Sequence, residues 1–320
     1  MKKGVITLVF ILLVSCIVLA NNFQDFDQGT FSNTYYNGSS ILLKGTNITG
    51  NFTSRIFDAS TISLWNNMSF VSSTPSSEEF YAVDAQANVY FSQNSGVSWS
   101  LKNASYTNTL PGGTQDIFSD VNNKLYIIKQ AGRQIYRSDN NGLTWDIINS
   151  TFANKDLYAA TSHLTNLYVF GATGAGWKSS DSGKSWTALA DFNNGNNQNP
   201  TGSATNSSGA IFALDSSGAV YSSIDSGATW NLKISDYGRA TDSQDMFSDR
   251  LNSLYVVTSS NKEVWKSSNS GVSWNMINKT FSNLPLLTGS SDSLGNLYVI
   301  SGAVLGAVYK SSDAGVTWNK

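Results

Sequence analysis

The sequence predicts an all-β fold, a six-bladed β-propeller, and three observations support this prediction. An eight-residue box that ends in tryptophan occurs six times, at Trp99, Trp145, Trp186, Trp230, Trp274 and Trp318. Successive boxes lie 46, 41, 44, 44 and 44 residues apart, which is the repeat length of a propeller blade. Between the boxes, short aromatic and β-branched runs alternate with Gly, Asn, Asp and Ser, as in strands joined by tight turns. Seven blades are the alternative.

Each repeat predicts four strands in a fixed order. In the fifth repeat these are "DMFSD" (245–249) as inner strand, then "LYVV" (254–257), "EVWKS" (263–267) and "SWNMIN" (273–278). The box forms the turn between the third and the outer strand. An aromatic residue recurs nine residues before each box tryptophan, and another 18 to 20 residues before it. These aromatics indicate strands that pack against neighbouring blades.

The box pattern S-x-D-x-G-x-[ST]-W resembles the Asp-box, or BNR repeat, of sialidase-like propellers, over residues 80–318. The resemblance implies a hairpin on the outer rim of each blade, away from the ligand face. The box acid position holds Asp181, Asp225 and Asp313 in three copies and Asn94, Asn140 and Asn269 in the others. Both residue types cap turns but only aspartate ionises, so we expect the boxes to be structural. The glycines expected to close these turns with positive φ are Gly96, Gly142, Gly183, Gly227, Gly271 and Gly315.

Residues 1–20 predict a secretory signal peptide. Two lysines precede an apolar run from Val5 to Ala20, with cleavage expected after Ala20. The alternative is a lipoprotein modified at Cys16 in "LVSC", and Cys16 is the only cysteine. Sixteen apolar residues are short for a membrane span, so we expect none after cleavage. The mature chain is therefore predicted to be secreted or to lie at the cell surface.

The mature chain is predicted to divide into two parts. Residues 21–52 form a Ser/Asn/Thr-rich extension, and residues 53–320 form the propeller. The last repeat lacks an outer strand after Trp318, and an open propeller would expose two strand edges. We expect "TSRIFDAS" (53–60) to supply the closing strand and "LWNNMSF" (64–70) to be the inner strand of the first blade.

The residues do not reveal a catalytic constellation. The sialidase resemblance implies an arginine cluster and a tyrosine with a glutamate partner, but none is recognisable among the predicted inner strands. Glycoside hydrolases need two facing carboxylates, and Asp116 and Asp245 occupy matching positions on inner strands. We interpret this match as repeat degeneracy. His163 is the only histidine, and no acid follows "DNNG" (139–142) at calcium-loop spacing, so no metal or cofactor is expected.

The sequence favours a non-catalytic glycan- or protein-binding or scaffold module, expected to be a monomer. The alternatives are a secreted glycoside hydrolase and, by family analogy alone, an envelope assembly factor. A net charge of −2 argues against nucleic acid as a partner. We expect ligands at the channel mouth near loops 109–116, 191–202 and 235–245. The candidate ligand-binding residues are Gln115, Asp116, Arg239, Gln244 and Asp245.

Eight Asn-x-Ser/Thr sequons make the chain a candidate glycoprotein. They begin at Asn37, Asn47, Asn51, Asn67, Asn103, Asn149, Asn206 and Asn278. Three of these, Asn103, Asn149 and Asn278, lie four residues after a box tryptophan. That position belongs to the predicted outer strand, where a glycan would leave the channel open.

Overall fold

The structure is a computed structural model, and it divides the chain into two compact units, residues 1–58 and 59–320. The residues it describes are 30–32, 34–36, 41–43, 51–53, 65–71, 79–84, 86–107, 114–130, 132–238, 242–249, 251–281, 285–302 and 307–320. In the first unit, β1 (Thr30–Ser32) pairs with β4 (Asn51–Thr53), and β2 (Thr34–Tyr36) pairs with β3 (Ile41–Leu43). Both pairs are antiparallel.

The described part of the second unit contains six antiparallel sheets, one for each predicted blade. Blade 1 is β5 (Trp65–Val71), β6 (Glu79–Asp84), β7 (Val89–Ser92) and β8 (Ser100–Asn103). Blade 2 is β9 (Thr114–Ser119), β10 (Leu125–Lys129), β11 (Gln134–Ser138) and β12 (Asp146–Asn149). Blade 3 is β13 (Leu157–His163), β14 (Asn166–Gly171), β15 (Gly176–Ser179) and β16 (Thr187–Ala188). Two short 3-10 helices, Phe152–Asn154 and Ala172–Gly174, lie between these strands.

The second half of the ring repeats this arrangement. Blade 4 is β17 (Pro200–Thr205), β18 (Ile211–Asp215), β19 (Val220–Ser223) and β20 (Asn231–Ile234). Blade 5 is β21 (Ser243–Ser248), β22 (Leu254–Thr258), β23 (Val264–Ser267) and β24 (Asn275–Asn278). Blade 6 is β25 (Leu286–Ser291), β26 (Leu297–Ser301) and β27 (Ala307–Ser311), and a bridge joins Lys310 to Asn319.

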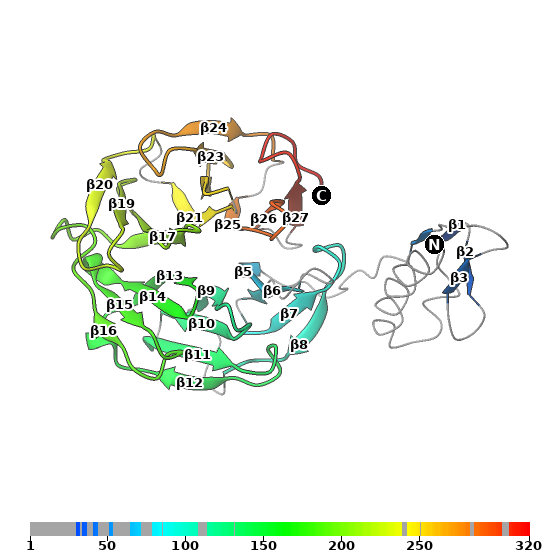
Figure 1. Ribbon diagram of the computed structural model, residues 1–320, viewed down its shortest axis with the longest axis horizontal. Helices are drawn as coiled ribbons and strands as arrows, with labels where there is room; N and C mark the ends of the chain where they lie inside the picture. The colour runs from blue at the N-terminus through cyan, green and yellow to red at the C-terminus, as the bar shows by residue number, and fades with distance from the viewer. Residues whose placement is uncertain are drawn as a thin grey trace, which may run out of the picture. The chain divides into compact units, whose positions relative to one another are not determined.

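The six sheets close into a ring (Figure 1). The innermost strands contact one another in the order β5, β9, β13, β17, β21 and β25, and β25 contacts β5 again. The predicted six-bladed propeller is therefore confirmed and the seven-bladed alternative is wrong. The predicted inner strand at 64–70 corresponds to β5. Apart from Thr53 in β4, the predicted closing strand at 53–60 lies outside the described residues and stays a prediction.

Burial follows the position of each strand within its blade. The second strands β10, β18, β22 and β26 are buried at every residue, because both faces of each sheet pack against neighbouring blades. The outer strands β8, β12, β20 and β24 expose their first two residues. The hydrophobic core is thus divided into clusters that lie between successive blades.

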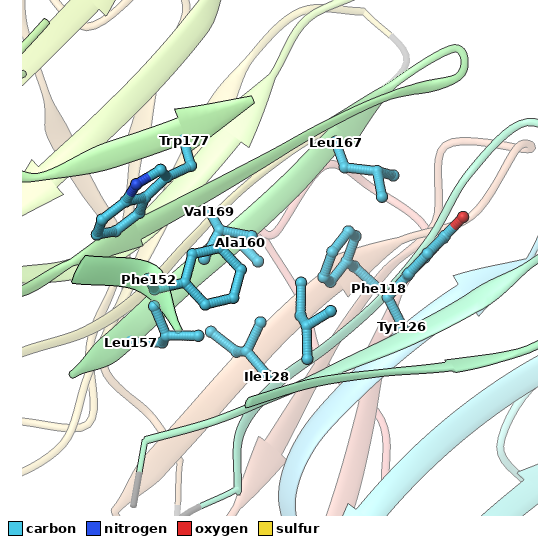
Figure 2. Packing of buried hydrophobic residues seen from close by; sticks show 10 residues of the cluster. Phe118, Tyr126, Ile128, Phe152, Leu157, Ala160, Leu167, Val169 and Trp177 are labelled. Atoms are coloured by element: carbon cyan, nitrogen blue, oxygen red, sulfur yellow. The ribbon is translucent and has the colours of Figure 1, made fainter. Parts of the chain in front are cut away.

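Figure 2 shows one of these clusters, between blades 2 and 3. Phe118 and Ile128 of blade 2 pack with Leu167 and Val169 of blade 3 in the same buried cluster. Phe152, in the connection between the two blades, belongs to the cluster as well. The connection therefore contributes a side chain to the core.

The same kind of aromatic plug recurs in every described connection. The plugs lie six or seven residues after a box tryptophan and are Tyr106, Phe152, Phe192, Tyr237 and Phe281. Each plug packs against two rings of the next blade, the third-strand aromatic and the box tryptophan, at centroid distances of 5.0–6.0 Å. Sequence reasoning missed this series, although its fixed offset from the boxes was a readable signal.

Candidate functional site

The centre of the propeller contains a cavity of about 290 Å³. The inner strands of blades 2 to 6 line it, with the predicted candidates Asp116 and Asp245 among the lining residues. Of the fifteen other lining residues, eight are serine or threonine, and the rest are apolar or glycine. The cavity is therefore polar, with acidic side chains at two points of its wall.

A series of hydroxyl groups links the inner strands around this cavity. Ser162 donates to the Ser119 carbonyl at 2.5 Å, and Thr205 donates to the Ser162 carbonyl at 2.6 Å. Ser248 then donates to the Thr205 carbonyl, and Ser291 to the Ser248 carbonyl, at 2.6 and 2.7 Å. Each bond joins one blade to the blade before it. These hydroxyls satisfy main-chain acceptors at the edges of the inner strands.

Asp116 and Asp245 bind the next blade in the same manner. Asp116 Oδ2 accepts a hydrogen bond from Ala160 N at 3.0 Å. Asp245 Oδ2 accepts from Thr288 Oγ1 at 2.7 Å and from Gly289 N at 3.2 Å. Strand register places both aspartates at equivalent positions of blades 2 and 5. Both carboxylates therefore connect blades, as repeat degeneracy would produce.

Burial raises the pKa values of both carboxyls. Burial is the main cause for Asp116, and the charge of Asp245 adds to it. Burial raises the pKa of Asp245 to about 6, although Thr288, Gly289 and Met246 donate hydrogen bonds that oppose the shift. The six inner strands contain no lysine or arginine that could offset the two charges. Both carboxyls thus lie in similar surroundings and bond to a neighbouring blade. The acid and the nucleophile of a glycoside hydrolase, by contrast, lie in unlike surroundings that separate their pKa values.

The other ligand-binding candidates do not add to this arrangement. Gln244 is exposed in β21. Gln115 lies in β9, but its side chain is outside the described residues, as is Arg239. Of the predicted ligand-binding residues, the structure thus brings Asp116 and Asp245 together at the central cavity.

The box turns share one hydrogen-bond pattern. In each turn the first serine donates to Oδ1 of the box Asp or Asn and accepts from the N–H of the box glycine. Oδ1 also accepts from the N–H of the Ser or Thr before the tryptophan, at 2.8–2.9 Å. The box glycines have φ between +81° and +92°, where a side chain would be strained.

Aspartate and asparagine differ only in one bond of this turn. In the aspartate boxes Oδ2 accepts from the Ser or Thr hydroxyl, and in the asparagine boxes Nδ2 donates to that hydroxyl. Donors of this kind, led by the Ser or Thr hydroxyl, lower the pKa of Asp181, Asp225 and Asp313 to about 2. The hydroxyl reverses its role, so the turn accommodates either residue.

The two ends of the blades differ in surface chemistry. Antiparallel order puts the hairpin between strands 1 and 2 at the same end as the box turn, which we call the box face. The hairpin between strands 2 and 3 and the connection to the next blade form the opposite end, the connection face. The box face exposes aliphatic side chains by 53–84%, at Val97, Val121, Leu143, Leu164, Ile224, Leu251, Val272, Leu294 and Val316.

The connection face is polar where it is described. Among its described residues no large apolar side chain is exposed, and the exposed ones include Asp191, Asn194, Asn196, Asn197 and Asp236. On the box face, by contrast, Val121 N donates to the Leu164 carbonyl at 3.1 Å, so two of the exposed aliphatic tips are neighbours.

Comparison with protein-family models gives no match for this chain, and comparison with curated proteins gives none either. Solved structures do match. A structure of YCF48 bound to D1 peptide has a TM-score of 0.55 at 16% identity, over 82% of each chain. YCF48 from Cyanidioschyzon merolae gives 0.54 at 16% identity, over 81% of this chain and 85% of that one. Virginiamycin B lyase from Staphylococcus aureus gives 0.58 at 10% identity, over 79% and 85%.

These likenesses agree with the six-bladed propeller described above. At 10–16% identity they show the fold alone. Their roles differ, since one structure holds a peptide and the other protein is a lyase. The resemblance to the Asp-box family stays a prediction.

Several sequon asparagines have structural partners. Asn103 Nδ2 donates to the Leu143 carbonyl, and Asn278 Nδ2 donates to the Val316 carbonyl, which joins an outer strand to the next box turn. Asn149 Oδ1 accepts from Thr151, and Asn206 Oδ1 caps the hairpin that begins blade 4. The side chains of Asn51 and Asn67 are outside the described residues, as are Asn37 and Asn47 altogether.

Two kinds of feature are absent from the described part of the chain. No helix there has the length and apolar composition of a membrane span. No three side chains of the His, Cys, Asp or Glu types come together there in a metal-binding group.

Proposed function

We propose that this chain is an exported, non-catalytic propeller that binds a protein ligand at the channel mouth of its box face, and not at loops 109–116, 191–202 and 235–245 of the connection face, where the sequence led us to expect the ligand. The observation that carries the proposal is the set of exposed aliphatic side chains around that mouth, such as Leu164, Leu251 and Leu294. Exposed apolar residues gathered on one face are typical of protein-binding surfaces. A structure of similar fold, YCF48, is bound to a peptide.

The channel carboxylates support a non-catalytic role. Asp116 and Asp245 both accept hydrogen bonds from the next blade, so each carboxylate has an oxygen engaged in joining two blades. A glycoside hydrolase remains the rival function. A screen of glycosides should therefore detect no turnover by the purified chain. Turnover that is lost on changing Asp116 or Asp245 to alanine would establish the rival.

Peptide and glycan arrays separate the two classes of ligand. The full chain should bind peptides, and Leu251→Ser with Leu294→Ser should abolish that binding. The matched control is Leu101→Ser with Leu232→Ser, which changes two leucines that are about half exposed on outer strands. Binding to glycans alone, unaffected by the box-face variant, would overturn the choice of a protein ligand and direct attention to the polar connection face.

Export is tested separately. We expect residues 1–20 to direct secretion and to be removed after Ala20. The mass of the chain recovered from a secreting host checks this expectation. A mass that retains residues 1–20, or that shows lipid on Cys16, would contradict cleavage after Ala20.

A further inference from the structure

A buried amide oxygen in the connection between blades 3 and 4 has no hydrogen-bond donor. Asn193 is only 2% exposed. Its Nδ2 donates to the Gln198 carbonyl at 2.8 Å, which fixes the orientation of the amide. Its Oδ1 accepts no hydrogen bond from the described residues. A buried acceptor without a partner is costly, so this oxygen is a candidate ligand atom.

A carboxylate oxygen lies beside this amide oxygen. Gly174 has φ +82°, and a Cβ added to it would collide with both Asp191 Oδ1 and Asn193 Oδ1. The two oxygens therefore converge over the Cα of one glycine. Asp191 Oδ1 accepts from Asn193 N at 3.0 Å, and Asp191 Oδ2 accepts from Gly195 N at 3.1 Å. These bonds hold the carboxylate in place without supplying a donor to Asn193 Oδ1.

A second acidic group with a free oxygen belongs to the same neighbourhood. Asp215 is fully buried, and its Oδ2 has no partner among the described residues. In blade 1 the matching Asp84 uses Oδ2 to accept from Asn88 and Tyr90, so blade 4 departs from the repeat. The next residue, Ser216, donates from Oγ to Gln198 Oε1 at 2.9 Å and from its N–H to the Asn199 carbonyl at 2.9 Å, which places this turn against the connection at residues 191–199.

The described lysines and arginines do not neutralise these carboxylates. Among the described residues, no lysine or arginine forms an ion pair with Asp191 or Asp215. Lys155 donates instead to Thr173 Oγ1, at 2.8 Å. Asp191 Oδ1 and Asn193 Oδ1 are both acceptors, and they repel each other where no positive charge compensates them. A cation bound between the two oxygens removes that repulsion.

We propose that the connection at residues 191–199 binds one calcium ion through Asp191 and Asn193, above Gly174. Carboxylate and amide oxygens are ligands for hard divalent cations. Calcium accepts irregular oxygen coordination completed by water, whereas magnesium requires near-octahedral geometry. Asp191 is exposed, so water can complete the shell. This site departs from the sequence expectation of no metal, and it stands independently of the protein-ligand proposal.

Calorimetric titration of the chelator-treated full chain tests the site. We expect one calcium ion per chain with a dissociation constant of about 0.1–1 mM, the range of extracellular calcium modules. Magnesium should bind at least about tenfold more weakly, since the loop does not impose an octahedron. Calcium should also raise the melting temperature, because it binds the folded chain.

Variants identify the ligands. Asp191→Asn should weaken calcium binding at least about tenfold by removing the charged ligand, and Asn193→Asp should tighten it by replacing an amide with a carboxylate. The matched control is Asn194→Gly, at an exposed neighbouring position with φ +53° that glycine adopts readily. Its affinity should equal that of the unchanged chain.

Three results would overturn the proposal. One is the absence of both calcium-dependent heat and a melting-temperature shift in the unchanged chain, which would mean that the buried oxygen holds only water. The second is an affinity left unchanged by both Asp191→Asn and Asn193→Asp, which would place the ion elsewhere. The third is an equal loss of affinity in Asn194→Gly, which would indicate a general effect on the loop.

Discussion

The box turns show at the scale of single residues how a repeat tolerates a change of chemistry. Asp181 accepts from the Ser185 hydroxyl, whereas Asn269 donates to the Ser273 hydroxyl. A hydroxyl both donates and accepts, so either partner is satisfied. The constant element is the first serine, whose Oγ bonds to both the acid position and the glycine N–H. This serine is therefore the residue on which the turn depends most.

Replacing that serine should destabilise the propeller. Ser267 is buried, and its Oγ accepts from Gly271 N at 2.9 Å. Ser267→Ala leaves this N–H without its acceptor, so we expect the free energy of unfolding to fall by about 1–3 kcal/mol. Denaturant titration measures the change. Ser268→Ala, at an exposed position of the same turn, should have almost no effect, and an equal loss in both variants would contradict the assignment.

The channel carboxylates make stability depend on pH. Burial raises the pKa of Asp245 from 3.8 to about 6, so the folded chain holds this proton more tightly than the unfolded chain. Between about pH 4 and pH 6 stability therefore falls as pH rises. Asp116→Asn with Asp245→Asn should flatten the melting temperature across this window.

The box aspartates do not titrate between pH 4 and pH 6. Their pKa is lowered to about 2, so the stability they contribute is lost only as pH falls below about 4. Asp181→Asn serves as the control variant and should leave the slope between pH 4 and 6 unchanged. A slope that persists in the double channel variant would mean that other groups cause it.

At the scale of elements, the connections between blades act as part of the core. Phe192 is fully buried and packs against Tyr221 and Trp230 of the next blade, at 5.8 and 6.0 Å. We expect Phe192→Ala to lower the free energy of unfolding by about 3–5 kcal/mol, because it leaves a cavity between two blades. Chemical denaturation measures the loss. Leu232→Ala, half exposed on an outer strand, should cost far less, and equal losses would contradict the role of the plug.

Sequence reasoning recovered the elements better than the contacts between them. Tryptophan spacing and aromatic runs determine where strands and box turns lie, since these residues are rare and their offsets are fixed. The bond from Asp116 to Ala160 N could not be predicted, because a main-chain N–H is present at every residue. The Ser162 and Thr205 links use small polar residues that also suit loops. The unpaired oxygen of Asn193 depends on the placement of Gln198 and Gly174, which only the folded loop brings together.

At the scale of the whole molecule, closure of the ring rests on contacts between its first and last blades. The inner strands β25 and β5 are in contact, and Phe80 packs edge-on against Tyr298 at 4.8 Å. In the described residues, the outer edge of β27 has only the Lys310–Asn319 bridge, whereas the other third strands pair with an outer strand. An uncovered strand edge is open to pairing, and the closing strand expected at 53–60 stays a prediction that truncation can test.

Two truncations test this closure. A chain that lacks residues 21–52 should unfold cooperatively at the melting temperature of the mature chain, because only the predicted extension is lost. A chain that lacks residues 21–60 should lose cooperative unfolding, since the edge of blade 6 is left uncovered and the ring opens. Calorimetry compares the two. Equal melting temperatures would show that the contact between β25 and β5 closes the ring without a strand from residues 53–60.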